Sequence, residues 1–161
     1  MKIKGITDED FVNYKKPSMF IAFPHCSFKC DKDCNMQVCQ NSTLANAPTI
    51  DVPIKSVVKR YMSNPISQAI VCGGLEPFDS FCDLSSLIAG FREYTNDDIV
   101  IYSGYNKNEI YLHKTYKNLF NRSYPNIIVK FGRYIPGRPQ IFDAVLGVNL
   151  ASDNQYAERI T

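Results

Sequence analysis

The sequence predicts an α/β fold, either a partial (β/α) barrel or an open, mostly parallel sheet. Two observations support this prediction. Apolar runs of about five residues alternate with segments whose apolar residues recur at helical spacing, which is the pattern of βαβ units. The chain has 161 residues, of which 45% are apolar and 21% charged. This is the size and composition of one globular domain, which we expect to span residues 1–161.

Four short apolar runs predict the strands of the sheet. Pro24 ends the first run, Gly73-Gly74 the second and Ser103-Gly104 the third, and these residue types are typical of turns. The predicted strands are Met19–Phe23, Gln68–Cys72, Asp98–Tyr102 and Ile127–Phe131.

Helical spacing predicts three helices between these strands. The first is Asp51–Met62, with Asp51 as its N-cap. The second begins at Asp79 as N-cap. Its apolar stripe is Phe81, Leu84, Leu87, Ile88 and Phe91. The third runs from the N-cap Asn106 to about Phe120. Its apolar side is formed by Leu112, Tyr116 and Leu119.

Right-handed crossovers place the carboxyl ends of all parallel strands at one edge of the sheet. Three loops are expected to converge there: the segment 24–42, the turn Gly73–Pro77 and the turn Ser103–Gly104. Ligand sites of parallel α/β sheets lie at that edge. The sequence therefore predicts a binding site built from these loops.

The segment 24–42 holds four of the six cysteines, Cys26, Cys30, Cys34 and Cys39. The start of the chain shows no secretory signal, so we expect a reducing, cytoplasmic location, where clustered thiols favour metal or redox chemistry over structural disulfides. The cysteine spacing is a poor match to two zinc knuckles. It suits a 4Fe–4S cluster held by three thiolates, with one iron left for a ligand. Zinc binding and a thiol switch remain alternatives.

Two further classes of partner are not expected. The net charge of +2 is too small to indicate nucleic acid binding. No apolar run approaches the ~18–20 residues that a membrane span needs. Lys130, Arg133 and Arg138 form a basic stretch that is either solvated or placed to meet an anion.

The cysteine segment resembles the cluster loop of the radical S-adenosylmethionine (SAM) activases. Their pattern is Cys-x3-Cys-x2-Cys, with x-Asn after the third cysteine. Cys26 and Cys30 match the first pair. Cys39 matches the third position because Gln40-Asn41 follow it, which makes 31–38 an expanded loop. Cys34 is the alternative third ligand, since its spacing is nearer to that of the family.

Other segments extend this resemblance. The turn CGGLEPF resembles the family's Gly-Gly-Glu-Pro motif, with Leu75 inserted before Glu76. The stretches YSGY, FGRYI and SDNQ are similar to segments of the anaerobic ribonucleotide reductase activating proteins. The resemblance implies SAM contacts at Asn41, Gly73, Gly74, Glu76 and Ser103.

The resemblance also implies a fold of the small radical SAM type and an activity. A 4Fe–4S cluster on Cys26, Cys30 and Cys39 would cleave SAM reductively and so install a glycyl radical in a partner, the anaerobic ribonucleotide reductase. An electron donor such as flavodoxin would supply the electron. The basic stretch would then meet the SAM carboxylate or an acidic partner surface. Two other functions stay open: a radical SAM enzyme acting on a small molecule such as a deazapurine precursor, and a non-catalytic iron–sulfur or zinc-binding module.

Overall fold

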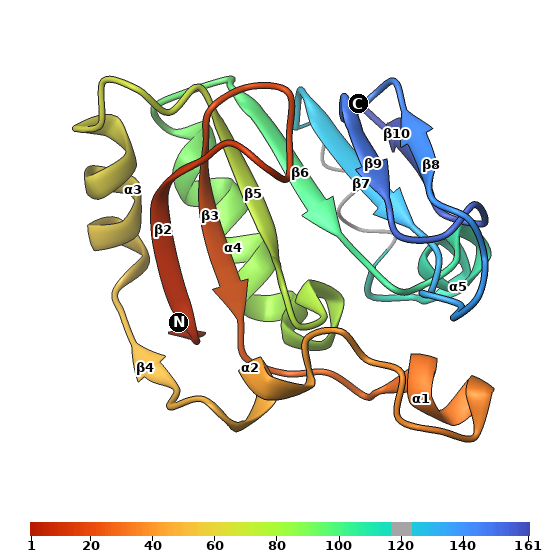
Figure 1. Cartoon of the computed structure of the whole chain (residues 1–161). Helices are drawn as coiled ribbons and strands as arrows, with labels where there is room; N and C mark the ends of the chain where they lie inside the picture. Colours follow the sequence, from red (N-terminus) through yellow and green to blue (C-terminus); the bar gives the residue numbers. More distant parts are fainter. Residues whose placement is uncertain (117–123) are drawn as a thin grey trace.

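The computed structural model describes residues 1–116 and 124–161. Its centre is a six-stranded sheet in the order β10-β7-β6-β5-β3-β2 (Figure 1). The four inner strands are parallel, and the two edge strands run antiparallel to them. The inner strands are β3 (Ser18–Phe23), β5 (Ala69–Gly74), β6 (Asp98–Tyr102) and β7 (Ile127–Phe131). The predicted α/β class with a mostly parallel sheet is confirmed, and within the described residues the sheet is open rather than a closed barrel.

All four predicted strands are present. The strands outside this parallel core were not predicted. The edge strands are β2 (Gly5–Asp10) and β10 (Tyr156–Arg159). Two small antiparallel pairs flank the sheet. They are β1 (Lys2–Ile3) with β4 (Ile50–Asp51), and β8 (Ile141–Asp143) with β9 (Val148–Leu150). These strands are short and mostly polar or half-exposed, so no apolar run marks them.

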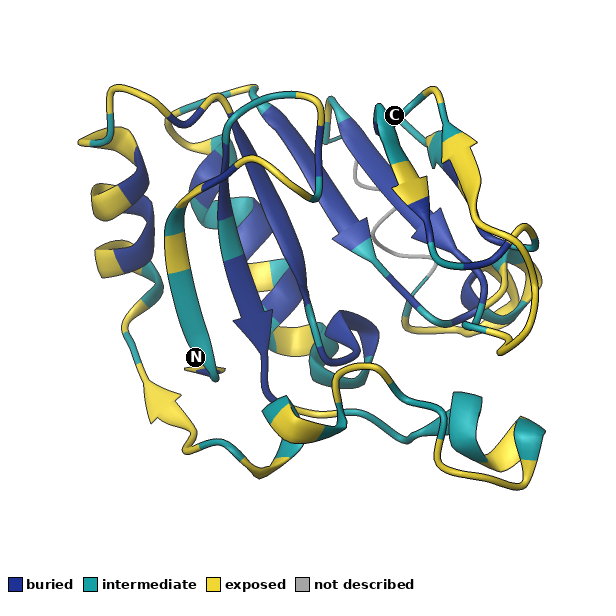
Figure 2. Ribbon diagram, in the orientation of Figure 1, coloured by how far each residue is buried: buried dark blue, intermediate teal, exposed yellow. Residues whose placement is uncertain are grey.

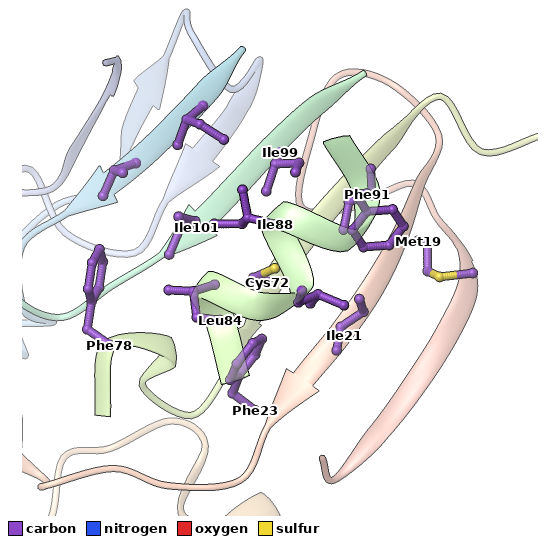
Figure 3. Packing of buried hydrophobic residues seen from close by; sticks show 14 of the residues in the cluster. Met19, Ile21, Phe23, Cys72, Phe78, Leu84, Ile88, Phe91, Ile99 and Ile101 are labelled. Atoms are coloured by element: carbon purple, nitrogen blue, oxygen red, sulfur yellow. The ribbon is translucent and has the colours of Figure 1, made fainter. Parts of the chain in front are cut away.

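Helices α3 (Ile54–Met62) and α4 (Phe81–Arg92) cover one face of the sheet (Figure 1). Alternate strand residues point toward these helices, as the period of a strand requires. Figure 3 shows α4 packed over Ile21, Cys72, Ile99 and Ile101 of the strands. In Figure 2 the central strands are buried almost throughout, whereas the cysteine segment is half-buried or exposed.

The opposite face of the sheet carries a smaller apolar cluster. Val71, Val100 and Ile128 of the strands pack there with Leu146 and Leu150. Two segments cover this face. One is the loop between β2 and β3, which contributes Tyr14, and the other is the β8–β9 region, which contributes Leu146 and Leu150. Phe20 and Tyr102 lie at its margin.

Two predicted helix starts are wrong. Asp51 belongs to β4, where it pairs with Lys2, and α3 begins only after the extended residue Pro53. Asp79 lies inside a short 3-10 helix, η1 (Pro77–Ser80), which precedes α4. Its carboxylate accepts hydrogen bonds from the Ser27 amide and the Tyr105 hydroxyl instead of capping a helix. In both cases the carboxylate that was expected to cap a helix accepts hydrogen bonds from another part of the fold.

The third predicted helix is shorter than expected. Asn106 is the N-cap as predicted, and Glu109 accepts a hydrogen bond from its amide in a capping box. Helix α5 (Lys107–Leu112) ends where His113 turns extended and stacks on Tyr116. Leu112, predicted on the apolar side, is 83% exposed. Leu119 and the predicted end at Phe120 lie outside the described residues.

The cysteine segment contains two further short helices that the sequence analysis did not predict, α1 (Lys29–Cys34) and α2 (Ser42–Asn46). Both lie beyond the carboxyl ends of the parallel strands (Figure 1). Across the described residues, no helix is both long enough and apolar enough to cross a membrane.

Candidate functional site

A cavity of about 490 Å³ lies at the carboxyl edge of the parallel strands. The segments that follow all four strands line it. Cys26 and Asn41 come after β3, Glu76 after β5, Ser103 after β6 and Gly132 after β7. The predicted convergence of the strand-end loops is therefore observed. Phe20 and Tyr102 also line the cavity, which places it on the sheet face opposite α3 and α4.

The four loop cysteines divide between two cavities. Cys26, Cys30 and Cys39 line the main cavity. Cys34 lines a separate, smaller cavity of about 280 Å³, and Cys30 borders both. All four cysteines have free thiols. The structure thus brings together the three cysteines that the resemblance singled out and separates Cys34 from two of them.

The environment of Cys26 and Cys30 favours the neutral form of these two thiols in the metal-free protein. Burial raises the pKa of Cys26 to about 12, against the effect of the Phe28 amide, which donates to its Sγ at 3.2 Å. Burial also raises the pKa of Cys30. The charge of Cys39 adds a smaller increase to the pKa of each of these two thiols, so Cys39 lies within electrostatic reach of both Cys26 and Cys30. A bound metal centre reverses this balance because it stabilises thiolates.

The turn after β5 brings the backbone into the cavity. Gly74 lines the cavity and has φ +80°, and a Cβ there would lie 2.9 Å from Ala22 Cα, so only glycine fits. Asn41 donates its side-chain amide to the Gly74 carbonyl at 2.7 Å. Gly73 does not line the cavity. A Cβ on Gly73 would meet the Phe20 ring at 3.0 Å, so packing explains this glycine.

Glu76 ties the turns after β5 and β6 together. Its buried carboxylate accepts hydrogen bonds from the Ser103 hydroxyl at 2.9 Å, the Gly104 amide at 2.8 Å and the Phe78 amide at 3.2 Å. Burial outweighs these bonds and raises the pKa of Glu76 to about 7. The side chains of Glu76 and Ser103 therefore bond each other and shape the cavity wall.

Lys130 is a further functional candidate. From the sequence, its side chain is expected either to be solvated or to meet an anion. Its side chain is buried and lines the cavity. The ammonium donates to the carbonyls of Gly132 at 2.8 Å and Ser103 at 3.3 Å, which use two of its three N–H donors. It forms no salt bridge with any described residue. Burial lowers the pKa of Lys130 to about 8. In the sequence, the sign of this role was a lysine inside the otherwise apolar strand Ile127–Phe131.

The other cations near the cavity are already paired. Glu109 accepts from Arg133 Nη2 at 2.6 Å and from Lys29 Nζ at 3.3 Å. Burial would raise the pKa of Glu109, but these cations and the Asn106 amide hold it at about 2. Arg133 also pairs with Asp33 of α1 at 2.9 Å. These bonds anchor the cysteine segment to α5 and to the loop after β7.

The donor set of the main cavity consists of three cysteine thiols, which are soft ligands of the kind that iron–sulfur clusters and zinc use. Among residues 1–116 and 124–161, no group of three His, Cys, Asp or Glu side chains could hold one metal ion. A lone zinc ion needs its ligands about 2.0–2.3 Å from one point. A four-iron cluster binds each thiolate at a different iron, so its ligands lie further apart. Three thiols of one loop that line a common cavity would supply the ligands for such a cluster.

Fold and cavity define the class: an α/β protein with an open, mostly parallel sheet and a cysteine-lined cavity at its carboxyl edge. No protein-family model matches the chain, and neither does any curated protein or solved structure. The functional assignment therefore depends on the residues of the cavity.

Proposed function

We propose that the protein is a radical SAM activase of the small radical SAM fold type. In this proposal Cys26, Cys30 and Cys39 hold a 4Fe–4S cluster, and the remaining cavity binds SAM. Its substrate is a glycine of a partner enzyme, the anaerobic ribonucleotide reductase, and a donor such as flavodoxin supplies the electron. The observation that carries the proposal is the shared cavity of these three thiols and the glycine turn after β5.

A 4Fe–4S cluster held by Cys26, Cys30 and Cys39 would supply one electron for reductive cleavage of SAM at its bond between sulfur and the 5′ carbon, the chemistry needed to remove a hydrogen atom from a glycine Cα. The chain's own groups hold and orient the ligands. Proton transfer by a protein acid or base is not required.

The glycine turn offers backbone groups to the amino end of SAM. Gly74 lines the cavity, and its φ of +80° and its close packing against Ala22 require glycine at this position of the turn. Asn41 holds the Gly74 carbonyl, and Glu76 holds the turns after β5 and β6 at a fixed separation. These residues therefore keep the ligand-facing backbone in place before the ligand arrives, which lowers the entropic cost of binding.

Lys130 complements the carboxylate of SAM. A buried ammonium that forms no salt bridge is costly, and an incoming anion in direct contact reduces that cost. Its third N–H donor is the group available to that anion. Lys29 and Arg133 are less suited to this role because Glu109 and Asp33 already neutralise them.

The size of the cavity favours a protein substrate over a small molecule. A volume of about 490 Å³ suits one ligand of moderate size. With cluster and SAM inside, little room remains for a second small molecule. A partner loop can instead approach from outside and exclude water from the radical.

The test is anaerobic reconstitution with iron and sulfide, followed by dithionite and SAM. We expect about four irons and four sulfides per chain, as the cluster formula requires, and formation of 5′-deoxyadenosine. Zinc without colour would instead show a zinc module. Disulfides among the loop cysteines without metal would show a thiol switch.

A second assay identifies the substrate. The reconstituted protein is mixed with anaerobic ribonucleotide reductase, and the glycyl radical is measured by electron paramagnetic resonance. A radical signal that depends on SAM is expected. Steady formation of 5′-deoxyadenosine without a protein radical, stimulated by a deazapurine precursor, would indicate the small-molecule enzyme.

A further inference from the structure

The segment between Cys30 and Cys39 closes into a compact loop. Helix α1 ends at Cys34, and Asn35 follows in the left-handed conformation with φ 51°. The Met36 amide donates to the Asp31 carbonyl at 3.2 Å, and the Asn35 amide donates to the Lys32 carbonyl at 3.3 Å. This pair of bonds is a Schellman motif, which reverses the chain at a helix end.

The side chain of Asp31 continues this closure up to the third cysteine. Its Oδ1 accepts hydrogen bonds from the backbone amides of both Val38 and Cys39, each at 2.8 Å. Asp31 directly follows Cys30 in the sequence. The Asp31 carboxylate therefore joins the beginning of the expanded loop to its end. Cys30 precedes Asp31 in the sequence, and the Cys39 amide is one of its hydrogen-bond donors.

We propose that Asp31 is a positioning residue that fixes Cys39 relative to Cys30 and so completes the cluster site. The inference rests on the proposed function of the three thiols. The expanded loop needs such a clamp because eight residues, 31–38, replace a short spacer. With the clamp in place, Cys39 shares the cavity of Cys26 and Cys30, whereas Cys34 lies on the smaller one. Asp31 thus decides which cysteine is the third ligand.

The clamp is tested first in the metal-free full-length protein, by hydrogen exchange of single backbone amides measured with NMR. In Asp31→Ala we expect exchange at Val38 and Cys39 to accelerate roughly tenfold or more, the effect of losing a hydrogen bond to a charged acceptor. Asp31→Asn keeps an acceptor oxygen and should restore most of the protection. The matched control is Asp33→Ala on the same helix, because Asp33 pairs with Arg133 and not with these amides.

The second arm measures iron and sulfide per chain after reconstitution. Asp31→Ala should retain less than half of the wild-type cluster, and Asp31→Asn should retain most of it, with unchanged urea unfolding midpoints in both. Unaltered exchange at Cys39 together with full cluster content in Asp31→Ala would overturn the clamp and leave the proposed function intact. A wild-type protein that binds no cluster would overturn both, whatever the exchange data show.

Discussion

The two ends of the parallel sheet each bury a carboxylate, but the groups that donate hydrogen bonds to it differ between the two ends. At the amino ends, Asp98 accepts hydrogen bonds from Lys16 at 2.6 Å, Arg159 at 2.8 Å and Tyr14 at 3.0 Å. At the carboxyl ends, Glu76 accepts from two backbone amides and the Ser103 hydroxyl, and from no cationic side chain among the described residues.

The pKa values follow this difference. Burial would raise the pKa of Asp98, but bonds from Lys16, Arg159 and Tyr14 hold it below its ordinary value. Burial raises the pKa of Glu76 and lowers the pKa of Lys130, and the charge of Glu76 opposes the shift at Lys130 without forming a salt bridge with it. The amino end therefore satisfies its charges internally and stabilises the fold. At the cavity end, Glu76 and Lys130 are buried without a salt bridge to any described residue, an arrangement that is common in binding sites.

The largest expected effect at the cavity end is loss of the cluster from Cys39→Ala. Removing one of three thiolates should reduce reconstituted iron from about four per chain to near background and abolish formation of 5′-deoxyadenosine. Cys34→Ala is the matched control and should retain both properties. Iron analysis and product assay of the two variants decide the point, and the reverse pattern would make Cys34 the third ligand.

The next largest effect is expected at the amino end. Asp98→Ala leaves Lys16 and Arg159 unpaired, and should lower the free energy of unfolding by about 2–3 kcal/mol, less than for a fully buried pair because both cations are partly exposed. Urea unfolding measures this change. Asp8→Ala, which breaks the exposed pair with Arg60, should cost less than about 1 kcal/mol. Equal losses in the two variants would contradict the special role of Asp98.

Unlike Asp98→Ala, the variant Lys130→Met should weaken SAM binding while leaving the free energy of unfolding almost unchanged. Replacing a buried charge without a carboxylate partner by an apolar side chain should change the unfolding free energy by less than about 1 kcal/mol. Affinity of the reconstituted protein for SAM should fall roughly tenfold, the value of one hydrogen bond to a charged group. Calorimetric titration checks the affinity. Strong destabilisation with unchanged SAM affinity would assign Lys130 to the fold alone.

The smallest effect is the pH dependence of the amino end. Because the folded-state pKa of Asp98 lies below its ordinary value of 3.8, its stabilisation is present at neutral pH and is lost as pH falls through the folded-state pKa. The stability difference between wild type and Asp98→Asn should therefore be constant above about pH 5 and shrink below about pH 4. A difference that grows on acidification would disprove this account.

The sequence predicted those elements whose burial leaves a periodic pattern. The strands β3, β5, β6 and β7 are apolar runs, and α4 follows its apolar stripe. Edge strands such as β2 escaped prediction because they carry isolated apolar residues, such as Ile6, and no apolar run, while backbone pairing helps to hold them to the sheet. The helix starts at Asp51 and Asp79 were wrong because each residue makes its contacts elsewhere in the fold.

By itself, the sequence determined the α/β class, the cysteine segment and the convergence of the strand-end loops, since apolar periodicity and crossover handedness are local or general rules. Only the tertiary structure decided that Cys34 lies on a different cavity, that Gly73 serves packing, and that Lys130 is buried without a salt bridge to any described residue. The physical reason is that burial and pairing depend on segments far apart in the chain, which no local pattern encodes.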